Sequence, residues 1–443
     1  MNKNIKLAVA GAVIAMSATA ANAGIIIPAG EWTLDIGGNV NTYATWTRNT
    51  GTATTGYATL WAGSGQGDAL SGLSGDNRTQ SNITTGLLPN YLSVTGTTRQ
   101  NDLDVSFTIS VNPGTSTTQS GKQSSHQENR QAFMTFGDKS WGSVKLGKDL
   151  GIFASDAILN DMTLLGVGSG AGGLAGNTTT TGRIGTGFMY ADWKGQIAYT
   201  TPNFNGFQAT VGITQPFNVW SNIAPGTART VTVSGASATG LLSGTISPAV
   251  AGDAYSSGRG GANMAYEGKA SYSWSGDFAG KIWVSGIAQK VNSLKASGSD
   301  TAVGGSDTFV KAGDIGANIN VAGFGLTGYY YRGEGIGQTV QLNGGFDKNG
   351  ARRDSEGGYV QATYVLPTKT KLGLSWGQSK LEDNGASDSM TGDLTDEMWA
   401  VGAYHPLTKH LNLVAEYTSV ESEYKGTGTA RGRTGSLGAI LFF

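Results

Sequence analysis

The sequence predicts an all-β chain that folds as one transmembrane antiparallel β-barrel. Short segments of alternating apolar and polar residues recur along it, and none after the N-terminal region is apolar for long enough to cross a bilayer as a helix. Glycine is abundant, at 70 of 443 residues, and proline is scarce, at 9. Glycine enrichment can indicate disorder, but Trp 10, Tyr 16 and Phe 14 are too many aromatic residues for an ordinary disordered chain.

The first 23 residues have the pattern of a secretory signal peptide. Lys3 and Lys6 precede an apolar run from Leu7 to Met16, and Ala21-Asn22-Ala23 supplies small residues for signal peptidase. We therefore expect export, with cleavage after Ala23. The mature chain, residues 24–443, is expected to form a single barrel domain.

Alternation is clearest near the C-terminus. Leu372, Leu374 and Trp376 share one face of a predicted strand, while Gly373 and Ser375 share the other. In a soluble sandwich the apolar face would form the core, whereas in a membrane barrel it meets lipid and the polar face lines water. Alternation alone leaves both interpretations open.

Loop lengths favour the membrane barrel. Short turns on one side and long loops on the other are typical of outer-membrane barrels, and structureless loops this long would be unusual in a compact soluble domain. The predicted short turns lie at Pro367–Thr370, Ser275–Asp277 and Val321–Gly323. The predicted long connections lie near Thr47–Gln80, Gln215–Gly261, Gly333–Glu356 and Glu382–Asp396.

Sixteen candidate strands can be counted, an even number that suits a bacterial barrel. The stretch from Phe188 to Gln208 has room for another hairpin, which leaves eighteen strands open. The predicted strands begin near Trp32, Gly86, Leu103, Gln131, Ser143, Phe188, Gln208, Met264, Gly280, Thr308, Phe324, Gly358, Lys371, Glu397, Leu411 and Thr434.

Charge and residue chemistry argue against several other functions. The formal net charge of −1 speaks against nucleic acid as a partner. The three histidines lie in no recognisable nucleophile motif, so we expect no enzyme activity. We expect no cofactor and no bound metal. The acidic stretch from Glu382 to Glu397 lacks EF-hand spacing, and a solvated outer loop is favoured over a divalent-cation site.

Four stretches resemble the Gram-negative trimeric general diffusion porins. The first two resemble a strand pair and a turn of that family, and the last two its recurrent periplasmic turns. In this sequence they read Asn129-Arg-Gln-Ala-Phe-Met-Thr-Phe136 with Trp141-Gly-Ser-Val-Lys-Leu-Gly-Lys148, then Tyr199-Thr-Thr-Pro-Asn-Phe-Asn-Gly-Phe207, Tyr364-Val-Leu-Pro-Thr-Lys-Thr370 and Tyr404-His-Pro-Leu-Thr-Lys-His410. The terminal Phe443 resembles the aromatic end that the barrel-assembly machinery reads.

The resemblance implies a trimer of sixteen-stranded barrels whose third loop, Asp149 to about Gly182, folds into the lumen. Acids on that loop and bases on the facing wall would create a transverse field across the water of a constriction. The implied acids are Asp149, Asp156 and Asp161, and the implied bases are Arg130, Lys145 and Arg183. Lys145 faces the lumen if Val144 and Leu146 face lipid.

The function predicted from these residues is a water-filled outer-membrane channel for passive diffusion of small hydrophilic solutes and ions. Two alternatives stay open: a solute-selective channel, and a structural or adhesive barrel that displays its long loops. Expected partners are other copies of the chain, outer-membrane lipid and lipopolysaccharide. Without the two lysines of the signal, 28 basic residues face 31 acidic ones, which favours a weak cation preference.

Overall fold

The structure is a computed structural model that describes residues 24–51, 78–116, 127–169, 178–219, 253–258, 263–295, 307–385, 388, 390, 392–426 and 428–443. The predicted signal peptide, residues 1–23, lies outside the described residues. In the described part of the chain, no helix has the length and apolar character needed to cross a membrane.

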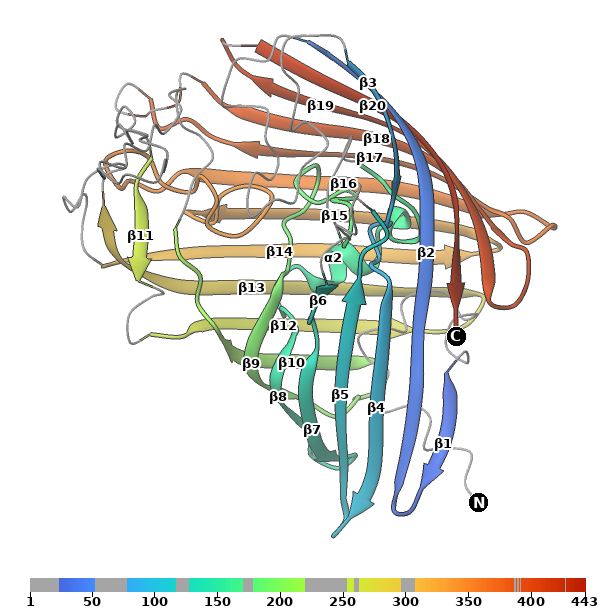
Figure 1. Cartoon of the computed structure of the whole chain (residues 1–443). Coiled ribbons are helices and arrows are strands. Elements are labelled where there is room, and N and C mark those ends of the chain that lie inside the picture. The colour runs from blue at the N-terminus through green and yellow to red at the C-terminus, as the bar shows by residue number, and fades with distance from the viewer. Residues whose placement is uncertain are drawn as a thin grey trace, which may run out of the picture.

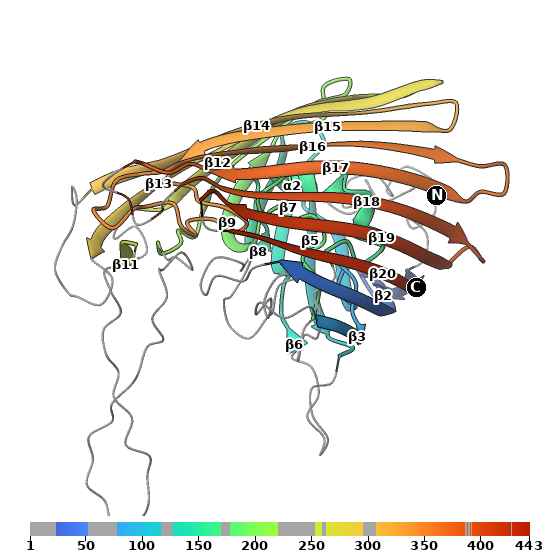
Figure 2. The ribbon, with the colours of Figure 1, turned by 90° about the horizontal axis from the view of Figure 1, so that it is seen from above.

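The strands form one curved antiparallel sheet (Figures 1 and 2). Sixteen of them make up a closed barrel. Each strand pairs with the next along the chain, and the last, β20, pairs with the first, β2, which closes the wall. The wall strands are β2 Trp32–Gly51, β4 Tyr91–Gln100, β5 Leu103–Pro113, β7 Ala132–Asp138, β8 Gly142–Leu150, β9 Trp193–Thr200, β10 Phe207–Thr214, β12 Ala265–Trp274, β13 Phe278–Lys295, β14 Asp307–Val321, β15 Phe324–Glu334, β16 Asp354–Val365, β17 Lys371–Leu381, β18 Leu394–Pro406, β19 Leu411–Tyr424 and β20 Gly428–Phe442.

Four shorter strands extend this wall. β1, Ile25–Ala29, and β3, Arg78–Thr84, pair with different parts of β2. β6, Gln127–Glu128, pairs with the end of β5, and β11, Tyr255–Gly258, pairs with the end of β13. They lengthen existing rows of hydrogen bonds and add no member to the ring.

The predicted count of sixteen is confirmed, and most predicted strand starts are within two residues of the observed ones. The extra hairpin between Phe188 and Gln208 is not formed, because this stretch holds one strand, β9, followed by a turn. Three predicted starts differ from the observed ones by more than four residues. The strand expected at Phe188 begins at Trp193, since residues 188–192 are buried irregular chain, and the strand expected at Gly86 begins at Tyr91. The third, Thr434, belongs to β20, which starts at Gly428.

The wall has an apolar outer face and a polar inner face, as predicted for a membrane barrel. On β17, Leu372 and Leu374 are 41% and 49% exposed, whereas the residue that follows them, Ser375, is 1% exposed. On β2, Val40 and Trp46 are exposed. The apolar side chains therefore point away from the barrel toward lipid.

The predicted asymmetry of the two barrel ends is also confirmed. At one end, which we call the turn end, strands are joined by short turns such as Val321–Phe324, where Ala322 and Gly323 have φ of 48° and 83°. Two residues with positive φ make the tight hairpin turn that suits strand twist. The other end, the loop end, carries longer connections such as residues 335–353. The long connections predicted near Thr47–Gln80 and Gln215–Gly261 lie largely outside the described residues. At the turn end, Phe443 N–H donates to Gly38 O at 3.1 Å and Gly38 N–H to Phe443 O at 2.9 Å.

Two connections form hydrogen bonds with residues of the wall strands. The first, residues 151–192 between β8 and β9, contains helix α2, Ser155–Leu159, and the 3-10 helix η2, Met162–Leu165; we call it the inner segment. The second, residues 335–353, joins β15 and β16. α2 lies on the concave side of the curved sheet (Figure 1). Both connections contribute to one buried apolar cluster, with Phe153 and Phe188 from the first and Val340 and Phe346 from the second.

Candidate pore constriction

The start of the inner segment is fastened to the wall by Glu267 on β12. Its Oε2 accepts hydrogen bonds from the backbone N–H groups of Ile152 and Phe153, both at 2.8 Å. Its Oε1 accepts from Lys194 Nζ at 2.5 Å and Thr214 Oγ1 at 2.8 Å. A fully buried carboxylate is stable here because four donors satisfy it, one of them charged.

The helical part of the segment is held by β16, on another side of the barrel. Tyr359 Oη donates to Ala157 O at 2.8 Å. Gln361 uses both ends of its amide, accepting from Met162 N–H at 2.7 Å and donating to Asn160 O at 3.0 Å. The short helices therefore meet the wall through side chains that satisfy their backbone groups.

A third anchor is Glu416 on β19. Its Oε2 accepts from the N–H groups of Val167 and Gly168 at 2.7 and 2.9 Å, and Tyr404 Oη donates to its other oxygen at 2.6 Å. A Cβ at Gly166 would lie 2.2 Å from the Glu416 carboxyl carbon, so this approach needs glycine. Strands β12, β16 and β19 thus each hold a different part of the segment.

Asp156, a predicted constriction acid, lies in α2 and forms ion pairs with two lysines of the wall. Lys269 Nζ on β12 is 3.2 Å from its Oδ2, and Lys281 Nζ on β13 contacts its Oδ1. Burial acts to raise the pKa of Asp156, but the two ammonium groups outweigh it and hold the pKa below its ordinary value. The bases predicted to face the loop acids were Arg130, Lys145 and Arg183, so the sequence analysis did not identify the two lysines that pair with Asp156.

Asp149 and Lys145 contact each other. Lys145 Nζ donates to Asp149 Oδ2, and Gln131 Nε2 donates to Oδ1 at 3.1 Å. The prediction that Asp149 lies in the third loop is wrong: it lies in β8, because pairing with β9 continues to Leu150. The two residues are four apart on one strand and so share its inner face.

Arg130 lies between β6 and β7 and is almost completely buried. Its Nε donates to Glu128 Oε2 at 2.9 Å and its Nη2 to Thr178 Oγ1 at 3.2 Å. The guanidinium also lies over the Trp193 ring, 5.9 Å from the centroid. Arg130 therefore joins the wall to the inner segment through Thr178, and none of the three predicted aspartates is among these partners.

Asp161 and Arg183 both lie within the inner segment, which extends to residue 192 and not to about 182 as predicted, because β9 starts late. Asp161 caps η2, accepting from Thr163 N–H and Oγ1 at 3.0 and 2.6 Å. Burial raises the pKa of Asp161, and the positive charge of Arg183 offsets this only in part. Arg183 donates to the carbonyls of Thr186 and Met398 and is fully buried.

The wall residues Lys269, Lys281, Glu267 and Glu416 were not predicted. Each is a charged residue on the polar face of an alternating strand, which is a weak signal available in the sequence. What brings them to the inner segment is the register of the strands, with Ser273 of β12 opposite Lys281 of β13. Alternation does not encode that register by itself.

The acidic stretch at the loop end, weighed above as a cation site, is engaged by basic side chains where the structure describes it. Arg353 donates to both oxygens of Asp253 at 2.7 and 2.8 Å and also contacts both oxygens of Asp388. Lys380 pairs with Asp393 at 3.1 Å. Over the described ranges, no group of three or more His, Asp or Glu residues is arranged to hold a metal ion.

A closed sixteen-stranded barrel with an apolar exterior and a charged interior defines an outer-membrane channel protein. Comparison with known sequences makes the assignment. The profile of the Gram-negative porin family matches residues 8–425, nearly the whole chain. The chain belongs to this family, and it is an outer-membrane porin, a non-enzymatic channel for passive diffusion. No curated protein sequence matches it.

Solved structures agree on the fold. The anion-selective porin from Comamonas acidovorans has a TM-score of 0.54 at 15% identity over 93% of this chain and 100% of that one. The outer membrane channel DcaP of Acinetobacter baumannii has a TM-score of 0.58 at 16% identity, over 95% of this chain and 100% of that one. OmpT of Vibrio cholerae has a TM-score of 0.53 at 14% identity, over 95% of this chain and 100% of that one. At these identities the likeness concerns the fold alone.

Proposed function

We propose that the inner segment narrows the water-filled lumen and that the constriction it forms prefers anions. The segment is supported from β12, β16 and β19 by Glu267, Gln361 and Glu416, which are widely separated around the wall. A solute crossing the barrel would pass between this segment and the remaining inner face. Small hydrophilic solutes would diffuse through, as in the porin family.

The observation that carries the anion preference is the cluster of Asp156, Lys269 and Lys281. Two ammonium groups share the Asp156 carboxylate. A further carboxylate close to them, Asp314, is 8% exposed and accepts hydrogen bonds from Ser285 and Tyr329. The lysine side chains are 26% and 30% exposed, whereas Asp156 is 4% exposed. Water in the lumen therefore meets positive charge, and a water-filled pore lined by one sign of charge concentrates ions of the other sign.

The pair on β8 has the same arrangement. Lys145 is 28% exposed and its partner Asp149 is 2% exposed. The excess of three acids over the mature chain points toward cations, but acids that are buried behind lysines contribute less to the field in the pore than the exposed lysines do. Of the predicted constriction residues, Lys145, Asp149 and Asp156 are those that we propose act in selectivity, with Arg130, Asp161 and Arg183 supporting the segment.

A solute-selective channel is the second candidate. Residues 335–353 also pack on the inner face, and Gln341 of this connection donates to the carbonyls of Tyr190 and Ala191 in the inner segment at 3.2 and 3.3 Å. Two connections that contact each other reduce the cross-section more than one, and a narrow pore discriminates between solutes by shape as well as charge.

Assembly is proposed on the resemblance described above. The chain would be exported with cleavage after Ala23, would be inserted by the barrel-assembly machinery through its terminal Phe443, and would associate as a homotrimer surrounded by outer-membrane lipid and lipopolysaccharide. The backbone hydrogen bonds between Phe443 and Gly38 support a role for the last residue in closing the barrel.

Single-channel recording in a planar bilayer under a salt gradient tests the proposal. The native protein should open in groups of three steps and give a reversal potential of the sign for anion preference. The double variant Lys269→Gln/Lys281→Gln should move that potential toward cation preference. The control Lys311→Gln removes an exposed lysine that pairs with Glu334 on the outer wall and should leave it unchanged. Cation preference in the native channel, or no shift in the double variant, would refute the anion constriction.

A further inference from the structure

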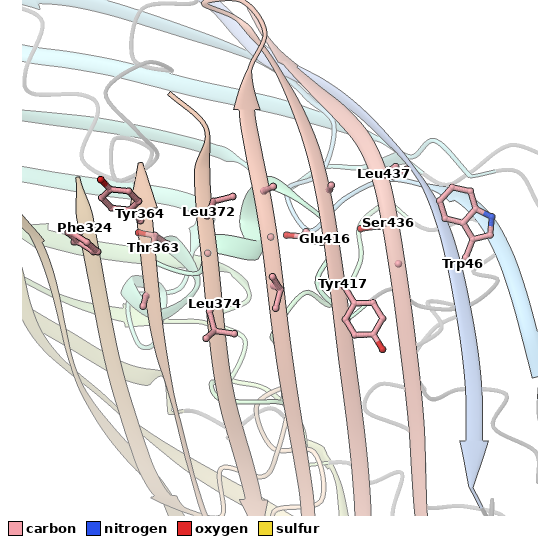
Figure 3. A pocket seen from close by; sticks show the side chains of 17 residues that line it. Trp46, Phe324, Thr363, Tyr364, Leu372, Leu374, Glu416, Tyr417, Ser436 and Leu437 are labelled. Atoms are coloured by element: carbon pink, nitrogen blue, oxygen red, sulfur yellow. The ribbon is translucent and has the colours of Figure 1, made fainter. Parts of the chain in front are cut away.

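The outer wall carries an apolar groove of about 700 Å³ that spans strands β15 to β20 and β2 (Figure 3). We call it the outer groove. Leu372, Leu374, Tyr417, Leu437 and Trp46 are among the side chains that border it. All five are on the lipid-facing side of the wall and exposed. The groove is therefore open to the hydrocarbon of the membrane.

Small residues create this groove. Gly435 on β20 lies between Tyr417 on β19 and Trp46 on β2, its direct partners in the two neighbouring strands. A Cβ built at Gly435 meets no atom within 4 Å, so the glycine is not required by packing within the barrel. Ala403 and Ala415 also face each other along the groove floor. The hollow thus lies between large aromatic neighbours and has room for another molecule.

Two arginines stand directly above the aromatic row, toward the loop end. Arg48 on β2 and Arg433 on β20 are direct register partners, and both side chains are exposed on the outer face. On the described residues, neither guanidinium has an ion-pair or hydrogen-bond partner. Like charges directly opposite each other destabilise a strand pair, so the position favours binding of an external anion between them.

Other cations on the outer wall near the loop end are paired. Arg332 lies 3.4 Å from Asp354, Lys311 lies 3.0 Å from Glu334, and Arg431 contacts Glu421. Among the residues that the structure describes, the two facing arginines differ from these neighbours in having no carboxylate within ion-pair distance. The strand residues on their other sides are Thr79 of β3 and Ser419 of β19, whose hydroxyl groups can donate to the same anion.

The height of the arginines matches lipid headgroups. They lie two residues beyond the Trp46–Gly435 pair, which is about 7 Å along a strand. Exposed tryptophan and tyrosine rings of a membrane barrel sit at the boundary between hydrocarbon and water. One step further toward the loop end is the layer in which the phosphates of outer-leaflet lipids lie.

We propose that Arg48, Arg433 and the outer groove form a binding site for a phosphorylated lipid of the outer leaflet. A phosphate lies between the two guanidinium groups, which can bind it through charge-assisted, bidentate hydrogen bonds. An acyl chain of the same lipid fills the groove beside Gly435. The inference rests on the outer-membrane location of the barrel and adds a ligand to its exterior, separate from the pore.

A second copy of the chain fits this surface less well than a lipid does. It would have to supply carboxylates to the arginine pair. The outward-facing acids Glu356, Glu397 and Glu421 near the loop end already accept hydrogen bonds from Tyr330, Trp399 and Arg431 of their own wall. On the outward face of β19, Glu423 then offers a single carboxylate against two guanidinium groups. A lipid supplies both the phosphate and the apolar chain at the required separation.

Native mass spectrometry of the detergent-solubilised trimer with diphosphoryl lipid A as the probe tests this site. Arg48→Gln/Arg433→Gln and, separately, Gly435→Leu should each lower the bound fraction at least tenfold. Arg332→Gln/Lys311→Gln is the matched control, because it removes two outward cations that already have partners, and it should bind like the parent. Channel conductance of all variants should stay unchanged, so a failure here is distinct from a failure of the porin function.

Three results would overturn the proposal. Parental binding by both test variants would exclude the site. Loss of trimers in the test variants without loss of lipid from the remaining assemblies would identify the surface as a contact between copies. Displacement of lipid A by inorganic phosphate, together with normal binding by Gly435→Leu, would reduce the site to an anion site without the acyl groove.

Discussion

Replacing Glu416 by leucine is expected to release the inner segment from the wall while the barrel stays closed. The carboxylate accepts from the backbone N–H groups of Val167 and Gly168, both of which are buried. Leucine has no acceptor, so both N–H groups lose their partner. Opening of the segment returns them to water, and the substitution therefore favours the open form.

The size of the effect follows from those two groups. An unsatisfied buried N–H costs about 1–3 kcal/mol, so opening becomes easier by about 2–6 kcal/mol for the pair. At 1.4 kcal/mol per tenfold this is about a 30-fold to 10⁴-fold larger open population. The lower part of the range is expected, because leucine also removes the cost of burying a carboxylate. Glu416→Gln keeps one acceptor oxygen and should have a smaller effect.

Trypsin reports the opening, because Arg183 is the only Lys or Arg in residues 151–192 and is fully buried in the folded protein. When opening and closing are fast relative to cleavage, the cleavage rate after Arg183 follows the open population. The rate should rank Glu416→Leu above Glu416→Gln above parent. Glu423→Leu, an exposed position on the same strand, is the control. Equal rates in the parent and Glu416→Leu would refute the idea that this carboxylate holds the segment.

Three further outcomes are expected. Because the pKa of Asp156 lies below its ordinary 3.8, its charge persists as the pH falls to about 4. The difference in reversal potential between the parent and Asp156→Asn should therefore be constant from pH 7 to 4 and disappear below that as Asp156 is protonated; a change in this difference between pH 7 and 5 would contradict the reasoning. Arg353→Leu leaves the buried carboxylates of Asp253 and Asp388 without their cation and should lower stability by about 3–5 kcal/mol in denaturant titrations, more than Asp388→Asn does. Burial acts to raise the pKa of Asp388, but Arg353 holds this pKa at about 2. The stability that the Arg353–Asp388 pair contributes is therefore fully present above the unfolded pKa near 3.9 and should be lost only as the pH falls through about 2. Deletion of Phe443 removes two backbone hydrogen bonds to Gly38 and should reduce the yield of heat-modifiable, folded barrel in outer-membrane fractions, whereas a Leu407→Ala control at a turn should not.

The strands could be predicted best at the turn end, where the determining residues are local. Asn101 and Asp102 have φ of 48° and 62°, as a two-residue hairpin turn requires, and apolar alternation begins directly beside such turns. At the loop end the pattern is weaker. Strand β20 was expected to start near Thr434 and starts at Gly428, because Arg431 and Arg433 occupy outward positions where apolar residues would mark a strand.

The site could be predicted only in part, because its pairs depend on register. Asp156 was identified through resemblance as an acid of the third loop, and it does carry ion pairs with the wall. Its partners Lys269 and Lys281 are 113 and 125 residues away in sequence. Choosing them requires the register of several strands together with the path of the inner segment. A single strand's alternation defines which face a residue is on and not what lies opposite it.

A chain with more acids than bases can present a basic pore because irregular backbone inside a barrel requires acceptors. The inner segment exposes N–H groups that no strand satisfies, and carboxylates provide for them: Glu267 binds Ile152 and Phe153, Glu416 binds Val167 and Gly168, and Asp161 binds Thr163. A carboxylate used in this way is buried beneath the backbone that it binds. Lysine has donors only and cannot bind N–H groups, so Lys145, Lys269 and Lys281 keep part of their surface in water. The charge that a solute meets is therefore set by which charged groups remain exposed after the backbone has been satisfied, and the net charge of the sequence is a poor guide to it.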